Sequence, residues 1–92
     1  MYEITGIKVS SDPPSLGTIT DYYFTGRHGE KSLWVTKPSA VAHVRKYPDT
    51  VYVSGGGSTD YVEVVENGAN PYLRTKGNSS TSDNLLSQPI YK

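Results

Sequence analysis

Alternating apolar and polar residues along most of the chain predict a β-rich fold. Runs in which β-branched or aromatic residues alternate with polar ones are typical of half-buried strands. The pattern predicts about five such strands, at residues 3–9, 18–25, 31–35, 51–54 and 61–66. A short extended piece at residues 72–75 and a short terminal strand follow them. Gly6 interrupts the first run, which indicates a β-bulge or a close backbone approach at this point.

The same spacing assigns the side chains of each strand to faces, because successive side chains of a strand point to opposite sides of the sheet. In the second run, Ile19 and Tyr23 are expected on one face, and Tyr22 and Phe24 on the other. In the third run, Trp34 is expected on the face opposite to its two neighbours. Both faces of the predicted sheet therefore carry aromatic rings.

One segment has the pattern of a helix. Thr36-Lys37-Pro38 predicts its start, since threonine caps free amides and proline is tolerated in the first turn. The helix is expected to run to about Lys46, and Tyr47-Pro48 ends it because a residue before proline avoids helical geometry. The expected apolar stripe comprises Ala40, Val41, Val44 and Tyr47, with Ser39, His43 and Lys46 on the opposite side. A helix of about ten residues is stable only when docked on a sheet.

These elements predict an α+β fold in a single small domain that spans residues 1–92. The expected architecture is a twisted, mostly antiparallel sheet of about five strands with one helix on one face. The order of elements is β-β-β-α-β-β, followed by the short terminal strand.

Charge and composition exclude several classes of protein. Nine Lys and Arg residues balance nine Asp and Glu residues, which disfavours bulk nucleic-acid binding. The absence of cysteine excludes disulfides, thiolate zinc sites and thiol catalysis. No apolar run is long enough for a membrane helix, and residues 1–5 do not have the pattern of a leader. We therefore expect a cytoplasmic protein with no membrane partner.

None of the recognisable catalytic or metal-binding patterns is present. The Gly55-Gly56-Gly57 segment lacks the lysine of a phosphate loop and favours a hairpin loop. His28 and His43 lie fifteen positions apart without a second ligand at metal-binding spacing. Glu63 and Glu66 are expected on opposite sides of a strand, and no Gly-x-Ser-x-Gly motif occurs. We expect no enzymatic activity, no catalytic residues, no cofactor and no metal.

The C-terminal third carries a family resemblance. Its Tyr-Leu-Arg-Thr segment at residues 72–75 and its Asp-Asn-Leu-Leu-x-x-Pro segment at residues 83–89 are the specific motifs. With them, the chain resembles a family of short bacterial and phage proteins, domain of unknown function 3892, over nearly its whole length. The middle of the chain, including the Trp34 strand and the Gly55 loop, matches the family only by residue type. The resemblance implies no reaction, cofactor or catalytic residue.

The most specific polar cluster surrounds the first of these motifs. The candidate ligand or partner site comprises Arg74, Lys76, Asn78, Asp83 and Asn84. Arginine presents a planar fork of donors suited to a carboxylate or phosphate, and the amides and hydroxyls of residues 78–84 add adaptable donors. The structural alternative is that Asp83 pairs with Arg74 while Asn84 bonds backbone, so that Leu85 and Leu86 dock in the core.

Two functions remain open at this point. The first is a small non-catalytic binding or adaptor module that uses residues 74–84 to bind a protein partner or a small anionic ligand. The second is a nucleotide or nucleic-acid ligand binder in which Tyr22, Tyr52 and Tyr61 stack on bases beside Arg74. The tyrosines are equally expected to fill the half-buried face of a thin sheet. An unpaired sheet edge also predicts a homodimer as an alternative assembly.

Overall fold

The structure, a computed structural model, describes residues 1–10, 15–55, 58–76, 85 and 88–91. In this part of the chain the elements are β1 (Tyr2–Val9), η1 (Leu16–Thr18, a 3₁₀ turn), β2 (Ile19–Gly26), β3 (Leu33–Thr36), α1 (Lys37–Lys46), β4 (Val51–Gly55), β5 (Ser58–Val65), β6 (Tyr72–Thr75) and β7 (Ile90–Tyr91). The expected α+β class is confirmed, because one helix packs on a mostly antiparallel sheet.

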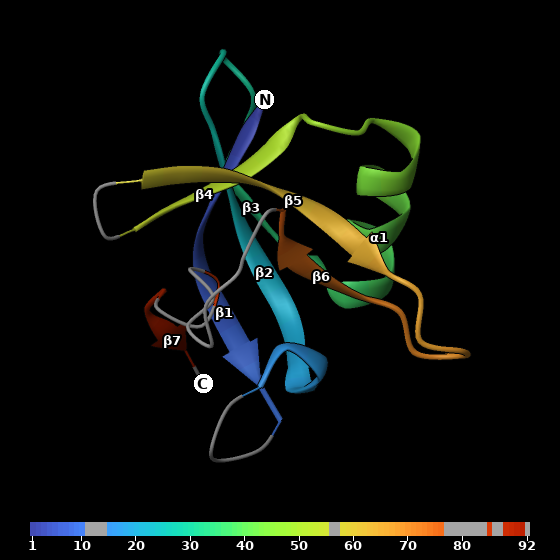
Figure 1. Cartoon of the computed structure of the whole chain (residues 1–92). Coiled ribbons are helices and arrows are strands. Elements are labelled where there is room, and N and C mark those ends of the chain that lie inside the picture. The colour runs from blue at the N-terminus through green and yellow to red at the C-terminus, as the bar shows by residue number, and fades with distance from the viewer. Residues whose placement is uncertain (11–14, 56–57, 77–84, 86–87, 92) are drawn as a thin grey trace.

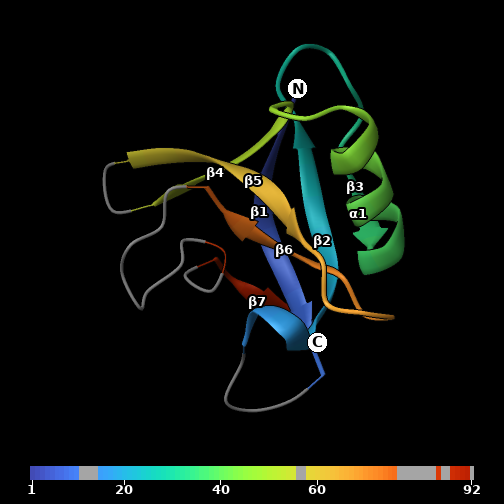
Figure 2. The ribbon, with the colours of Figure 1, turned by 45° about the vertical axis from the view of Figure 1, so that its right-hand side comes forward.

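The sheet has the strand order β3-β2-β1-β4-β5-β6, and β7 pairs with β1 (Figure 1). Strand β1 pairs with β2 along one side, and two strands share its other side. Parallel β4 pairs with Tyr2 and Glu3, and parallel β7 pairs with Ile7 and Lys8. Strand β4 pairs only with the start of β1. The part of the sheet formed by β4, β5 and β6 therefore diverges from the part formed by β1, β2 and β3. Helix α1 contacts β2 and β3 as well as β5 and β6, and lies along one side of the sheet (Figure 2).

The sheet contains one full strand more than the sequence indicates, since residues 72–75 form β6 rather than an isolated extended piece. A tight turn reverses the chain before it: the Asn70 amide donates to the Asn67 carbonyl at 2.9 Å, and Gly68 has a positive φ of 58°. Glycine adopts this left-handed conformation without steric cost. The turn directs β6 antiparallel onto β5, where Glu63 pairs with Arg74.

Two register shifts in the β1–β2 pair change the predicted faces. One lies between Ile4 and Gly6, which confirms the bulge expected at Gly6. The other lies between Lys8 and Val9, where Val9 pairs with Ile19 and Lys8 with Asp21. On β2, Thr20 lies between the two partner residues Ile19 and Asp21, and this extra residue resets the alternation of side chains. Ile19 is therefore buried on the same side as Tyr22 and Phe24, and its predicted face was wrong.

The helix has the predicted limits and docks through the predicted residues. Its buried side chains are Ala40, Val41 and Val44. Tyr47 was expected in this stripe, but it is 48% exposed because the backbone leaves helical geometry there. His43 was expected on the opposite side, yet it is half-buried. It follows Ala40 by three positions and precedes Val44 by one, which places it on the flank of the buried stripe.

One core lies between the helix and the inner face of the sheet. The core side chains are Ile4, Ile7, Ile19, Tyr22, Phe24, Ala40, Val41, Val44, Val51, Val53, Val62, Leu73 and Leu85. The predicted hairpins are confirmed, since β2 pairs antiparallel with β3 and β4 with β5. In the second hairpin the strands reach Gly55 and Ser58, so the connection is shorter than predicted. The expected homodimer stays a prediction.

Candidate functional site

The predicted site at residues 74–84 is described in part. Arg74 and Lys76 lie at the end of β6, whereas Asn78, Asp83 and Asn84 lie outside the described residues. The Arg74 Nε donates to the Glu63 carboxylate at 2.8 Å. The Lys76 Nζ donates to the Asp49 carboxylate at 2.5 Å, and this hydrogen bond raises the pKa of Lys76. Both predicted cations are therefore held by carboxylates, and an anionic ligand would compete with these pairs.

A shallow hollow of about 300 Å³ lies beside these cations, between the end of α1 and strand β5. We call it the charged hollow; it is lined by Val44, Arg45, Pro48, Val62, Glu63, Val64 and Lys76. Arg45 pairs with Glu66 at 2.5 Å. The two basic groups that line this hollow, Arg45 and Lys76, are thus each paired with a carboxylate, and so is Arg74 on the neighbouring strand β6. Exposed pairs of this kind contribute little stability and leave no net positive charge for an anion.

A second hollow, of about 320 Å³, is lined by aromatic side chains on the outer face of the sheet. We call it the aromatic hollow, and it is formed by Tyr23 of β2, Trp34 of β3 and Tyr91 of β7. Tyr23 and Trp34 are direct cross-strand partners, with ring centroids 5.1 Å apart in an edge-to-face arrangement. Trp34 and Tyr91 form a second edge-to-face pair at 5.3 Å. Edge-to-face contacts of this kind stabilise aromatic clusters beyond their buried area.

Gly6 allows the Tyr91 ring to lie close to strand β1. It pairs with Tyr23, and a Cβ atom at this position would lie 2.7 Å from the Cε1 atom of Tyr91. Only a residue without a side chain lets the Tyr91 ring lie this close to the backbone. Beside the hollow, the Lys8 Nζ lies 4.7 Å from the centroid of the Trp34 ring. The site therefore combines three rings with one ammonium group.

The sequence identified only part of this hollow. Alternation along the third strand places Trp34 on the face opposite to Leu33 and Val35, and the structure shows this face to be the outer one, where Trp34 is half-buried beside Tyr23. The contribution of Tyr91 could not be predicted, because it depends on the parallel pairing of Lys8 with Tyr91 across residues distant in the sequence. A two-residue strand such as β7 has no periodicity to detect.

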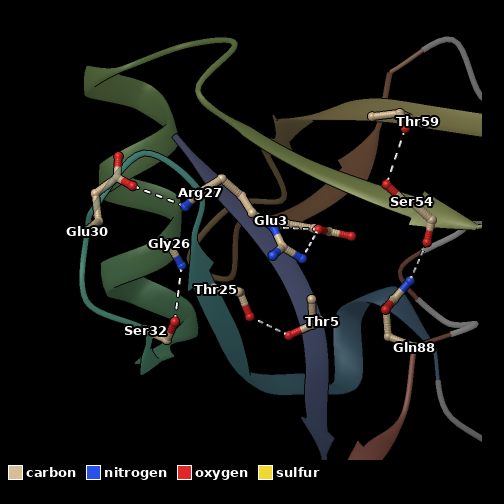
Figure 3. Close-up of polar contacts among 10 residues, drawn as sticks. All are labelled: Glu3, Thr5, Thr25, Gly26, Arg27, Glu30, Ser32, Ser54, Thr59 and Gln88. Carbon is tan, nitrogen blue, oxygen red and sulfur yellow. Dashed lines mark hydrogen bonds and ion pairs between the residues drawn. The ribbon is translucent and has the colours of Figure 1, made fainter.

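The remainder of the outer face is polar. Thr5 and Thr25 share a hydrogen bond of 2.7 Å between their hydroxyl groups, and Arg27 pairs with Glu3 (Figure 3). Farther along, the rings of Tyr52 and Tyr61 contact edge-to-face with centroids 6.4 Å apart. Tyr22 is fully buried, so its predicted role in stacking on bases was wrong.

His43 lies in an aromatic environment at the edge of the core. Its ring contacts Tyr2 at 5.6 Å, Phe24 at 5.9 Å and Tyr47 at 5.2 Å between centroids. Burial among these rings, and secondarily the charge of the Met1 amino group, lowers the pKa of His43. The two histidines therefore differ, since His43 is half-buried whereas His28 is exposed.

The lowered pKa of His43 predicts a loss of stability in mild acid. An unfolded histidine titrates near pH 6.5, so His43 contributes its stability above that value and loses it as pH falls through the lower folded pKa. Equilibrium denaturation between about pH 7.5 and 5 is expected to show a falling free energy of unfolding, and His43→Gln is expected to flatten this profile. Glu30, whose pKa is lowered to about 2 by hydrogen bonds from the Met1 amino group and the His28 amide, titrates below this window.

His28→Gln is the matched control for the pH experiment, because it removes the other imidazole from an exposed position. It is expected to leave the pH profile unchanged. A His43→Gln variant with the wild-type profile would contradict the assignment.

The described residues contain no group of three or more His, Asp or Glu side chains arranged to hold a metal ion. No helix in this part of the chain is long and apolar enough to cross a membrane.

Comparison of the whole chain with protein-family models, curated proteins and solved structures finds no match. The fold and the site define a small α+β domain with an aromatic hollow on its outer sheet face. The resemblance of residues 72–75 and 83–89 to a family of unknown function stays an expectation.

Proposed function

We propose that this protein is a small non-catalytic binding module and that the aromatic hollow receives its ligand. One observation carries the proposal: the single Trp of the chain stands with Tyr23 and Tyr91 around a hollow of about 320 Å³ on the face opposite to the core. Tryptophan and tyrosine are enriched at binding hot spots, because each offers a large rigid surface together with a polar tip.

The charged surface predicted from the sequence has weaker support. Arg74 and Lys76 are each paired with a carboxylate, and the charges around the charged hollow balance. The aromatic rings, in contrast, are only partly buried, since Tyr23 and Trp34 are half-buried. Tyr91 in particular is 50% exposed although it lies in contact distance of Trp34. Binding of a protein partner through residues 74–84 is the second form of the proposal, and it has less support.

The fluorescence of Trp34 provides a direct test, since no other tryptophan contributes. We would titrate the protein with a proline-rich peptide, an oligosaccharide, a nucleoside monophosphate and an alkylated ammonium compound. At least one probe is expected to give a saturable change in Trp34 emission. Tyr23→Leu is expected to weaken that binding by about tenfold or more, as for a hot-spot ring.

Tyr61→Leu is the matched control for Tyr23→Leu. Tyr61 also forms an edge-to-face pair across two strands, with Tyr52, but lies away from the hollow and is 40% exposed. It is expected to retain wild-type affinity. Circular dichroism checks that both variants are folded. Failure of all four probes to saturate, or equal affinity of Tyr23→Leu and wild type, would overturn the proposal.

A further inference from the structure

We infer that the aromatic hollow takes an alkylated ammonium group, and that the Lys8 ammonium covers the Trp34 ring until this ligand displaces it. The inference rests on the proposed function and names the chemical class of its ligand. Three features support it: the position of Lys8, the arrangement of the rings and the size of the hollow.

The first feature is the cation already present at the site. The Lys8 Nζ lies 4.7 Å from the Trp34 centroid, within the range of a cation–π contact. Lys8 pairs across the strands with Asp21, yet no ion pair among the described residues includes Lys8. The ammonium therefore rests on the negative face of the indole. A ligand cation placed there would meet the same attraction.

The second feature is the orientation of the rings. Tyr23 and Tyr91 both meet Trp34 edge-to-face, with interplanar angles of 66° and 78°. Rings set at such angles form walls around a common space, which is the arrangement that aromatic cages use to bind quaternary ammonium groups. Asp21 is two positions from Tyr23 along β2, so the alternation of the strand puts both residues on the same face.

The third feature is the size of the hollow. At about 320 Å³ it lies at the small end of ligand sites, which suits a head group better than a whole ligand. A primary ammonium such as that of Lys8 is compact and strongly hydrated. Methyl groups on the nitrogen replace part of that hydration with apolar surface that packs against the rings. An alkylated ammonium is therefore expected to displace Lys8.

The test compares choline with 3,3-dimethyl-1-butanol, which has the same shape but no charge. Both are titrated against wild-type protein at constant ionic strength, with Trp34 fluorescence as the readout. Choline is expected to bind at least about fivefold more tightly than the uncharged compound, as a cation–π contact predicts. Lys8→Gln is expected to tighten choline binding by about two- to fivefold, because no internal cation then competes.

Lys46→Gln is the matched control for Lys8→Gln. It removes a lysine whose Nζ lies 5.5 Å from the Tyr47 centroid, so the same charge and the same type of contact are lost away from the hollow. It is expected to leave choline affinity unchanged. A peptide with trimethyllysine, and its unmethylated counterpart, distinguish the two sources of an alkylated ammonium group. Tighter binding of the methylated peptide than of choline assigns the ammonium group to a protein partner. Tighter binding of choline assigns it to a small molecule.

Equal affinity for choline and its uncharged counterpart would overturn the inference, and so would unchanged or weaker choline binding by Lys8→Gln. If one of the other probe chemistries still saturates the Trp34 signal, the proposed binding function stands and only the ammonium assignment fails. If no probe of any class binds, both fail.

Discussion

Leu85→Ala is expected to lower the free energy of unfolding by about 2–4 kcal/mol, the range for truncating a buried leucine. Leu85 is fully buried in the core, although it belongs to the C-terminal segment that returns to the sheet. Two hydrogen bonds hold that segment near Leu85. The Gln88 side chain donates to the Ser54 carbonyl at 2.9 Å (Figure 3), and the Ile7 amide donates to the Pro89 carbonyl at 3.0 Å. Removing the leucine leaves a cavity below these contacts.

Thermal denaturation monitored by circular dichroism measures this effect. For a domain of this size, a loss of about 2–4 kcal/mol lowers the Tm by roughly 10 °C or more. Ile90→Ala is the matched control, since Ile90 belongs to the same returning segment but is 46% exposed. It is expected to change the free energy of unfolding by about 0.5 kcal/mol or less. An unchanged Tm for Leu85→Ala would show that the segment does not anchor the core.

Phe24→Ala is expected to cost about 3–5 kcal/mol, the largest effect of a single truncation in this fold. Phe24, in the second half of β2, is 2% exposed. Its ring contacts Tyr2 at 5.3 Å and His43 at 5.9 Å between centroids, so that it joins β1, β2 and α1. Its loss also exposes the His43 ring to water and is expected to return the His43 pKa toward its ordinary value.

Chemical denaturation measures the stability change of Phe24→Ala, and an NMR titration of the imidazole protons measures the pKa. Leu33→Ala is the matched control, because Leu33 is the cross-strand partner of Phe24 on β3 and is 45% exposed. It is expected to be close to neutral. A Phe24→Ala protein with nearly wild-type stability would contradict the placement of this ring in the core.

Local signals predicted the helix and most of the strands correctly. The limits of α1 agree with Pro38 in the first turn and with the Tyr47-Pro48 pair at the end. Thr36 stands at the N-cap position as predicted, but its side chain makes no capping hydrogen bond, so that part of the prediction was wrong. The hairpins depend on short connections, which place consecutive strands side by side. Such features are encoded by neighbouring residues and can be recognised without the tertiary structure.

Errors arose where a distant contact overrides the local pattern. The register shift between Lys8 and Val9 moves Ile19 into the core, although strict alternation assigns it to the other face. The pairing of Arg74 with Glu63 was not predicted, because it depends on β6 being a full strand of the sheet beside β5. Both pairings join strands whose register the local sequence does not encode.

The sequence by itself determined the α+β class, the limits of the helix, the bulge at Gly6 and the placement of Trp34 on the face opposite to its two neighbours, because each depends on residue type and short-range periodicity. Only the tertiary structure decided how these parts form a site. The parallel pairing of β7 with β1 carries Tyr91 over Gly6 and against Trp34, and this creates the aromatic hollow. Two residues at the end of the chain have no pattern of their own, and their position depends on the core contacts and hydrogen bonds that hold the returning segment.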